Sequence, residues 1–274
     1  MSILYLDQPT SLWVEIWNRE IGHQPIRCLS EVEVIYVHFT EICPARYPNL
    51  KVVLCPCTGI GHLSNIPKSI KIMYLDDKRF LFRDIWSTAH WTLYHILTLL
   101  NFNHEDLSEK TVGIVGMGRI GQQLYKLLLP HRCKFIFNDI SDRVPLEFPI
   151  TPLDKLCKNS DIITLHVNEN ETTFNLINDE MFHKMESKAY IINSSRSSIL
   201  CGPALLNAWE VGGLSGIALD VTETYNDKVK SELFRLNADT TQNVIIDKHS
   251  GGKTFKSSRD LTDKWLLEWY LKWR

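Results

Sequence analysis

A glycine-rich turn constrains the fold of this chain more than any other feature. Residues 112–121 read VGIVGMGRIG, so that an apolar strand leads directly into Gly116, Gly118 and Gly121 in the spacing G-x-G-x-x-G, and a helical run follows. The first glycine of such a turn permits a tight bend, the second leaves room for a pyrophosphate, and the third lets helix and strand pack closely. The segment therefore predicts a dinucleotide-binding fold.

The helix and the strand that follow this turn support the same prediction. Arg119 and Ile120 begin the helix, whose free N–H groups and positive dipole end face the place of the anion. A second apolar strand ends at Asp139, eighteen residues past Gly121. An acidic side chain at about this spacing accepts hydrogen bonds from the ribose hydroxyls of NAD and repels the 2′-phosphate of NADP. We therefore expect NAD, and Arg143 is the nearby residue that would reverse this preference.

Composition and charge exclude several classes of protein. Of the 274 residues, 44% are apolar and 23% are charged, and the net charge of −2 gives no basic surface for nucleic acid. No run approaches the roughly 18–20 apolar residues of a membrane span, and the start MSILYLDQ lacks the basic region of a signal peptide. The seven cysteines are scattered without the spacing of a metal site, which favours free thiols in a reducing cytoplasm.

The second half of the chain alternates between strands and helices. Continuous apolar runs of this kind are typical of parallel strands that are buried on both faces. The predicted strands span residues 111–116, 134–138, 161–167, 189–195, 215–221 and 243–247, and the predicted helices span residues 119–129, 178–185 and 203–211. Six strands with helical crossovers make a complete doubly wound domain.

The first part of the chain shows a rougher version of the same alternation. The runs ILYLD, VEVIYVHF, LKVVLCP and IKIMYL resemble strands, and SLWVEIW resembles a helix. A long helix at residues 87–101 follows. We therefore predict a smaller α/β domain over residues 1–85 and the dinucleotide-binding domain over residues 86–250.

The last segment, residues 261–274, is a tryptophan-rich amphipathic helix. Lys264, Glu268 and Lys272 form one polar stripe, and most of the other residues are apolar. Such a helix can lie on a membrane surface, but we expect it to pack on its own first domain or on a subunit partner. Residues 251–274 are accordingly assigned to the first domain.

Five local patterns together resemble the D-isomer-specific 2-hydroxyacid dehydrogenase family. They are STAHWT, GMGRIG, SDIITLHV, INDEMFHKMESKAYIINSSR, and GIALDV followed by NVIIDKHSGG. The match is good over residues 87–255 and loose before them. The resemblance implies an α/β fold with a doubly wound, Rossmann-type NAD domain and a smaller flavodoxin-like substrate domain completed by the C-terminal helix. It also implies a homodimer, with the STAHWT helix at its core.

The resemblance implies a role for two residues in catalysis. The family's substrate-binding arginine matches Arg196, whose planar guanidinium suits the carboxylate and adjacent carbonyl of a 2-oxo acid. The acid–base histidine matches His249, and imidazole titrates in the range that moving a hydroxyl proton requires.

Further site residues follow from the same resemblance. The carboxylate-gripping loop of the substrate domain matches Gly59, Ile60 and Gly61, where backbone N–H groups would bind the substrate. His166 and Asp220 are expected to contribute to cofactor binding, with His166 packed near the cofactor.

The third catalytic position departs from the family pattern. Family members carry a glutamate five residues after the aspartate that corresponds to Asp220, and this glutamate pairs with the histidine. Counting without gaps, Tyr225 takes its place, and Glu223 lies two residues earlier. A two-residue shift in the loop would bring Glu223 to His249. Otherwise the imidazole lacks a carboxylate partner, which would make it a poorer acid at neutral pH.

Two smaller departures surround the predicted site. The family usually has glycine after its arginine, where this chain has Ser197, and Thr-Pro before its histidine, where this chain has Asp247 and Lys248. Asp247 is thus a further candidate for contact with the imidazole.

Three functions remain open on the sequence alone. The first is an NAD-dependent oxidoreductase that interconverts a small D-2-hydroxy acid and its 2-oxo acid. A relative that oxidises formate or phosphite is the second, since such reactions tolerate a changed histidine partner. The third is a non-catalytic sensor or scaffold that binds NAD(H), although such a module needs neither Arg196 nor His249.

Overall fold

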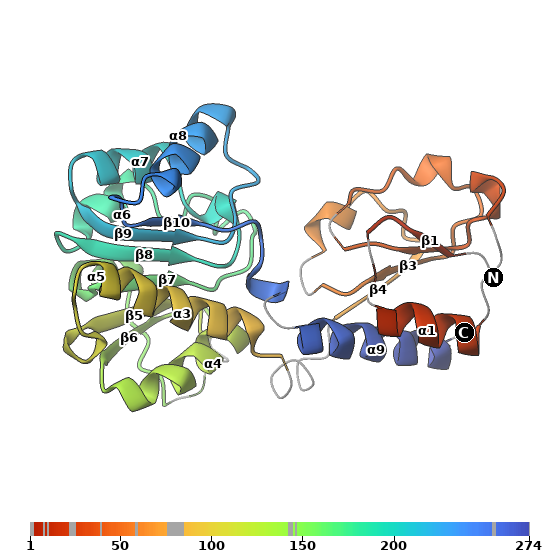
Figure 1. Cartoon of the computed structure of the whole chain (residues 1–274), viewed down its shortest axis with the longest axis horizontal. Helices are drawn as coiled ribbons and strands as arrows, with labels where there is room; N and C mark the ends of the chain where they lie inside the picture. The colour runs from red at the N-terminus through yellow and green to blue at the C-terminus, as the bar shows by residue number, and fades with distance from the viewer. Residues whose placement is uncertain are drawn as a thin grey trace. The chain divides into compact units, whose positions relative to one another are not determined.

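The chain folds into two compact units (Figure 1). The computed structural model describes residues 3–7, 9, 11–21, 26–38, 40–57, 60–75, 85–141, 145, 147–253 and 256–273. Unit 1 comprises residues 1–85 and 255–274, and unit 2 comprises residues 86–254. The sequence-based boundary at residue 250 differs from this division, because the backbone N–H of Gly251 donates to the Asp220 carboxylate of unit 2 at 2.9 Å.

Unit 2 is built on a six-stranded, fully parallel sheet. Its strands are β5 (Thr111–Val115), β6 (Lys134–Asn138), β7 (Ile162–Leu165), β8 (Ala189–Asn193), β9 (Leu214–Leu219) and β10 (Val244–Ile246). They lie in the order β10-β9-β8-β7-β5-β6, as Figure 1 shows. The order reverses at β5, because the chain places β6 on one side of it and β7 to β10 on the other. Ligands of such sheets bind beyond the carboxyl ends of the strands at this reversal.

Helices cover both faces of this sheet. They are α3 (Ser87–Phe102), α4 (Arg119–Leu128), α5 (Leu153–Asn159), α6 (Asp179–Lys184), α7 (Gly202–Glu210) and α8 (Asp227–Ala238). The apolar sides of α3 and α4 form one core with the sheet, and those of α5 to α8 form the other. The doubly wound domain that the sequence predicts is therefore confirmed, with α5 and α8 added to the predicted helices.

Unit 1 contains a smaller parallel sheet. Its strands β1 (Ile3–Tyr5), β2 (Val34–Tyr36), β3 (Val52–Cys55) and β4 (Lys71–Tyr74) lie in the order β1-β2-β3-β4. The α/β class is as expected. Within the described residues, the order of the strands follows the chain.

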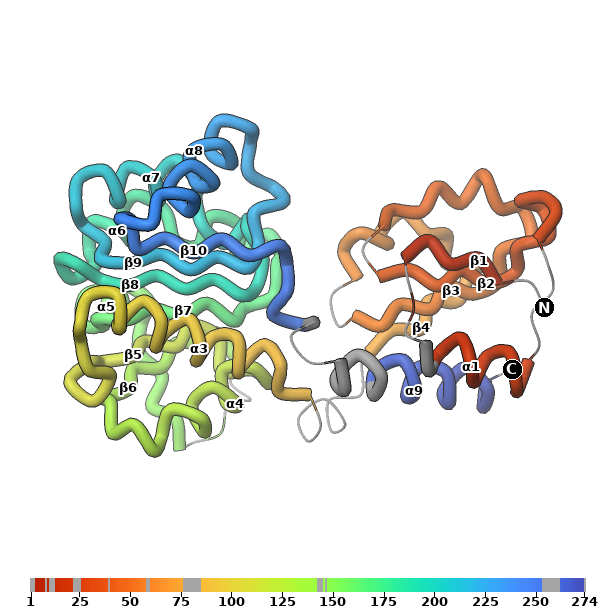
Figure 2. Tube along the Cα trace, in the orientation of Figure 1, coloured from red at the N-terminus to blue at the C-terminus, as the bar shows by residue number. Residues whose placement is uncertain are grey.

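Helices α1 (Ser11–Glu20) and α9 (Lys256–Trp273) lie side by side on one face of the unit 1 sheet, as Figures 1 and 2 show. The ring of Trp17 stacks on that of Tyr270 at 5.5 Å between centroids, and the hydroxyl of Tyr36 on β2 donates to Asp263 at 2.8 Å. The C-terminal helix therefore packs on its own first domain, one of the two expected positions. None of the described helices combines the length and the apolar character that crossing a bilayer requires.

Candidate active site and cofactor-binding turn

The glycine turn between β5 and α4 has the geometry of a phosphate cradle. Gly116 has a φ of 95°, and a Cβ there would lie 2.7 Å from the backbone carbonyl of His166. A Cβ on Gly121 would lie 2.1 Å from the carbonyl oxygen of Gly116, so only glycine lets α4 approach the turn. A Cβ on Gly118 would meet nothing within 4 Å. The turn thus leaves open space at the amino end of α4, which suits a pyrophosphate.

Asp139 lies beside the same turn, directly after β6. Its Oδ2 accepts a hydrogen bond from the backbone N–H of Met117 at 2.7 Å, and its Oδ1 accepts one from Ser141 at 2.8 Å. The carboxylate therefore braces the turn and lies at the edge where a ribose is expected. Arg143 lies outside the described residues.

The two residues that begin α4 contribute side chains to its packing. Burial lowers the pKa of Arg119 to about 10, and its Nη1 donates to Gln123 Oε1 at 3.3 Å. Ile120 packs at the edge of the core between the sheet and helices α3 and α4. At this position, the backbone N–H groups are what the turn presents to an anion.

His166 follows β7, on the other side of the strand-order reversal from Asp139. Its Nδ1 lies 3.3 Å from Ser194 Oγ, and its Nε2 has no hydrogen-bond partner among the described residues. Burial lowers the pKa of His166 to about 3, so the imidazole is neutral. The His166 ring is therefore a neutral, buried side chain directly behind the glycine turn.

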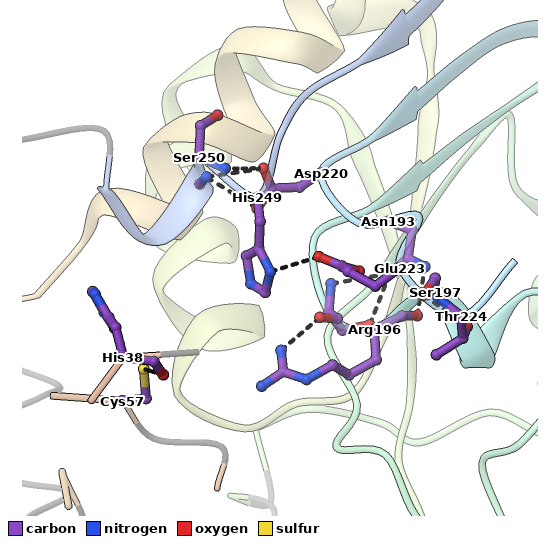
Figure 3. A network of polar contacts seen from close by, with 12 residues as sticks. His38, Cys57, Asn193, Arg196, Ser197, Asp220, Glu223, Thr224, His249 and Ser250 are labelled. Atoms are coloured by element: carbon purple, nitrogen blue, oxygen red, sulfur yellow. Dashed lines mark hydrogen bonds and ion pairs between the residues drawn. The ribbon is translucent and has the colours of Figure 1, made fainter. Parts of the chain in front are cut away.

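Arg196 lies three residues beyond the carboxyl end of β8 and directly before the turn η6 (Ser197–Ile199) (Figure 3). Its Nη1 donates to the carbonyl of Ser195 at 2.8 Å, and its own carbonyl accepts a hydrogen bond from Asn193 Nδ2 at 2.8 Å. The guanidinium thus projects from the edge of the sheet where doubly wound domains bind ligands.

His249 and Glu223 form a hydrogen-bonded pair at this edge. The Nδ1 atom of His249 lies 2.8 Å from Oε1 of Glu223, as Figure 3 shows. Burial of the Glu223 carboxyl raises its pKa, but the hydrogen bond with His249 and the charges of His249 and Arg196 lower it more. The net effect is a pKa below the ordinary value, so the carboxylate remains charged at neutral pH.

The prediction that Tyr225 replaces the glutamate beside His249 was wrong. Tyr225 is only 8% exposed and belongs to the core between the sheet and helices α5 to α8. A Cβ on Gly202 would lie 3.0 Å from its ring, and burial raises the pKa of its hydroxyl far above the ordinary value. Burying the aromatic ring in this core stabilises the fold more than placing it at the exposed edge of the sheet would. The loop after β9 therefore directs Glu223 toward His249.

Asp220 fixes the loop that carries His249. Its carbonyl accepts the N–H of His249 at 2.8 Å, and its carboxylate accepts the N–H groups of Ser250 at 2.6 Å and Gly251 at 2.9 Å. His249 has a φ of 53°, a left-handed conformation that costs about 1–2 kcal/mol for such a residue. The bonds to Asp220 hold the backbone in this conformation.

The comparisons with known proteins agree with this geometry. Residues 81–251 match the family model "D-isomer specific 2-hydroxyacid dehydrogenase, NAD binding domain". A D-specific alpha-keto acid dehydrogenase of Enterococcus faecalis is 32% identical over 253 residues, which cover 89% of this chain and 77% of that protein. The chain belongs to the D-isomer-specific 2-hydroxyacid dehydrogenase family. Its unit 2 is the NAD-binding domain of that family.

Other similar proteins show the range of the family and its fold. A glyoxylate reductase of Thermofilum pendens is 33% identical over 244 residues, covering 79% of this chain and 70% of that protein. A D-lactate dehydrogenase of Aquifex aeolicus, solved with NAD and lactic acid, has the same fold, with a TM-score of 0.80 and 24% identity over 99% of this chain and 96% of the other.

In this member of the dehydrogenase family, Asp247 binds residues other than the imidazole of His249. Its Oδ2 accepts hydrogen bonds from Trp91 Nε1 at 2.7 Å and Ser250 Oγ at 3.0 Å, and it lies 3.3 Å from His95 Nε2. Burial lowers the pKa of His95, although the charge of Asp247 opposes this. Asp247 thus links the histidine loop to α3. The sequence shows that Asp247 departs from the family pattern but gives no signal for these partners.

The loop of unit 1 that the sequence predicts to bind substrate is only partly described. Gly59 lies outside the described residues, Ile60 is half-buried, and Gly61, which is exposed, begins the turn η3 (Gly61–Leu63). Upstream of the loop, the thiol of Cys57 donates to the carbonyl of His38 at 3.2 Å. All seven cysteines are free, and the described residues contain no cluster of three His, Cys, Asp or Glu side chains suited to a metal ion.

Proposed function

We propose that this protein is an NAD-dependent oxidoreductase that interconverts a small D-2-hydroxy acid and its 2-oxo acid. The observation that carries the proposal is the Glu223–His249 pair, with its 2.8 Å contact, in the same unit as Arg196 and, like it, in a loop after the carboxyl end of a strand. Binding NAD alone requires none of these three side chains. An acid–base pair beside a guanidinium is what the reduction of a ketone next to a carboxylate requires.

The arginine is assigned to substrate binding. A 2-oxo acid presents a carboxylate oxygen and a carbonyl oxygen on the same side, and the planar guanidinium of Arg196 can donate to both. In the same contact, its positive charge stabilises the negative charge that develops on the carbonyl oxygen during reduction.

The histidine is assigned to proton transfer. Because Nδ1 of His249 contacts Glu223, the Nε2 atom is the one that exchanges a proton with the substrate oxygen. The Glu223 carboxylate favours the imidazolium form, which donates this proton during reduction. In oxidation, the neutral imidazole takes the proton from the hydroxyl group.

The residues around the glycine turn are assigned to the cofactor. When bound there, the cofactor would supply a hydride to C2 of the substrate as NADH during reduction, or accept one from C2 as NAD+ during oxidation. The open space at Gly118 and the first N–H groups of α4 would hold the pyrophosphate, and Asp139 would accept the ribose hydroxyls. His166 would pack behind the nicotinamide. We assign Asp220 to holding the histidine loop, since its carboxylate already accepts two backbone N–H groups.

Asp139 is expected to select NAD over NADP. The Asp139→Ala variant should show a smaller difference between its affinities for NADH and NADPH, because it lacks the carboxylate that repels the 2′-phosphate. Fluorescence titrations with NADH and NADPH measure this on both proteins, and a melting curve reports any loss of the bond from Met117. Equal affinities of the wild-type protein for NADH and NADPH would contradict the assignment.

A non-catalytic sensor of NAD(H) is the alternative from another class, and one experiment separates it from the enzyme. NADH binding is followed by fluorescence, and NADH oxidation is then measured with a panel of 2-oxo acids of increasing side-chain size. The proposal expects oxidation with at least one of them. Binding without turnover on the whole panel favours the sensor.

A formate or phosphite dehydrogenase is a weaker candidate. The sequence favours it only through the apparent loss of the glutamate that pairs with the histidine, and the Glu223–His249 contact removes that reason. A formate dehydrogenase of Staphylococcus aureus shares the fold, with a TM-score of 0.79 and 21% identity over 99% of this chain and 95% of the other. Likeness at this level concerns the fold alone.

We further propose a homodimer in which α3 lies at the interface. This helix carries Tyr94, 63% exposed, and Leu97, 40% exposed, so its outer face is apolar. Wild-type protein should elute at twice the chain mass of 31.8 kDa. Tyr94→Glu should give monomers, whereas Val211→Glu, at an apolar residue 75% exposed elsewhere in unit 2, should not. Size-exclusion chromatography with light scattering decides this, and a monomeric wild-type protein contradicts it.

We place this activity in the cytoplasm, without a nucleic-acid or membrane partner. Seven free cysteines suit a reducing compartment. The small net charge of −2 gives no electrostatic attraction to nucleic acid.

A further inference from the structure

One hydroxyl group joins the turn that follows Arg196 to the loop that carries Glu223. The Oγ atom of Ser197 accepts the backbone N–H of Thr224 at 3.0 Å and lies 2.8 Å from Thr224 Oγ1 (Figure 3). Ser197 is only 1% exposed, so this double contact is shielded from water on the serine side. The one buried hydroxyl of Ser197 thus takes part in two hydrogen bonds, which fix both the backbone and the side chain of Thr224.

Glu223 is the residue immediately before Thr224, and other contacts hold its backbone as well. Nζ of Lys230 on α8 donates to the carbonyl of Glu223 at 2.8 Å, and the ring of Tyr225, two residues after Glu223, is buried. The side chain of Glu223 is itself 53% exposed. Little packing therefore restrains this carboxylate, and its direction depends on the backbone that carries it.

We propose that Ser197 and Thr224 are positioning residues that hold Glu223 against His249. They act through the backbone of the loop and need not touch substrate or cofactor. They also place Arg196 and Glu223 on one hydrogen-bonded unit, so the group that binds the substrate carboxylate and the group that supports proton transfer keep a fixed spacing. This inference rests on the proposed function, in which Glu223 and His249 move the proton.

The pKa of Glu223 reports the position of its carboxylate, because charged groups surround it. His249 contacts the carboxylate, Arg196 lies close enough to lower its pKa, and Lys230 contacts its backbone from α8. If the loop is released, the carboxylate moves away from His249 and Arg196. The pKa of Glu223 then rises toward its ordinary value.

The test compares two variants of Thr224. Thr224→Val removes the hydroxyl at nearly constant volume, and Thr224→Ser keeps it. The valine variant should lower kcat for 2-oxo acid reduction at neutral pH by about tenfold, as expected for losing one hydrogen bond, with the KM of the 2-oxo acid and the Kd of NADH within about twofold. As the pH rises, the reduction rate of the valine variant should begin to decline at a lower pH than that of the wild-type protein. The serine variant should restore the wild-type rate and pH profile.

Ser198→Ala is the matched control. Ser198 is a buried neighbour on the same turn, and its hydroxyl donates to Glu169 rather than to the Glu223 loop. The control should leave the pH profile unchanged. An unchanged profile in Thr224→Val, or an equal loss in Thr224→Ser, would overturn the positioning role.

A second readout separates this inference from the proposed function. A carboxyl-carbon NMR titration gives the pKa of Glu223 without any turnover. The pKa should be higher in Thr224→Val than in the wild-type protein and unchanged in Ser198→Ala. If no 2-oxo acid is reduced by the wild-type protein, the proposed function fails, and this titration still decides whether Thr224 holds Glu223. An identical Glu223 pKa in all proteins would overturn the inference.

Discussion

Arg196→Ala is expected to lower kcat/KM for a 2-oxo acid by about a thousandfold. The variant loses two charge-assisted hydrogen bonds to the substrate, together worth several kcal/mol in transition-state binding. The Kd of NADH should change by less than about twofold, because the guanidinium is assigned to the substrate and not to the cofactor. Steady-state kinetics and a fluorescence titration with NADH measure the two quantities separately.

Arg235→Ala is the control for this prediction. Arg235 is an exposed arginine of the same unit, where it pairs with Glu232 on α8 at 2.6 Å, and its loss should change neither quantity. If NADH binding collapses in Arg196→Ala, the arginine supports the fold through its bond to the carbonyl of Ser195. The assigned substrate site would then be misplaced.

Glu223→Gln is expected to change the pH dependence of reduction as well as its rate. Reduction uses the imidazolium form of His249, and the carboxylate stabilises that form. The low pKa of Glu223 keeps this charge in place through the neutral range. Without the Glu223 carboxylate, the decline of the reduction rate with rising pH should begin at a lower pH. The rate should therefore be about 10- to 100-fold lower at pH 7, with a smaller loss in mildly acidic buffer.

Oxidation of the hydroxy acid and a control variant test the direction of this change in pH dependence. Oxidation of the hydroxy acid uses neutral imidazole, so Glu223→Gln should affect it less at alkaline pH. Glu232→Gln, at an exposed glutamate on α8, should leave both profiles unchanged. A Glu223→Gln enzyme with the wild-type profile would exclude the carboxylate from proton transfer.

The sequence predicts the framework of unit 2 well because its signals are local. Strands buried on both faces read as continuous apolar runs. Two of the three glycines of the turn are required by close contacts, Gly121 with the carbonyl of Gly116 and Gly116 with the backbone of His166. Helix α8 was not predicted, since its sequence DKVKSELFRLNA is largely polar. Its start is fixed by Asn226, whose side chain accepts the N–H of Val229 at 3.0 Å.

The partner of His249 could not be predicted from the sequence because loop paths depend on distant contacts. Counting residues from Asp220 favours Tyr225, but the burial of that ring and the bonds between Ser197 and Thr224 decide where the loop turns. Ser197 and Thr224 lie 27 residues apart in the chain. Nothing in either segment alone indicates that they meet.

The contacts of Asp247 were likewise not predictable from the sequence, because its partner on α3 lies even farther away in the chain. Its substitution for the family's usual residue is visible in the sequence, and a carboxylate next to His249 suggested a contact with the imidazole. The structure instead pairs it with Trp91, 156 residues earlier on α3. Strand β10 directs the side chain toward that helix, which residue order cannot reveal.

The most direct test of the proposed chemistry is the transfer of deuterium from NADH to a 2-oxo acid. Wild-type protein is incubated with a 2-oxo acid and with each of the two forms of NADH deuterated at C4 of the nicotinamide, and the product is analysed by mass spectrometry and chiral chromatography. We predict a D-2-hydroxy acid that carries deuterium at C2 with one of the two forms, and product formation that is about a thousandfold slower with Arg196→Ala. An L-hydroxy acid, a product without deuterium from either form, or NADH binding without any product would contradict the proposal.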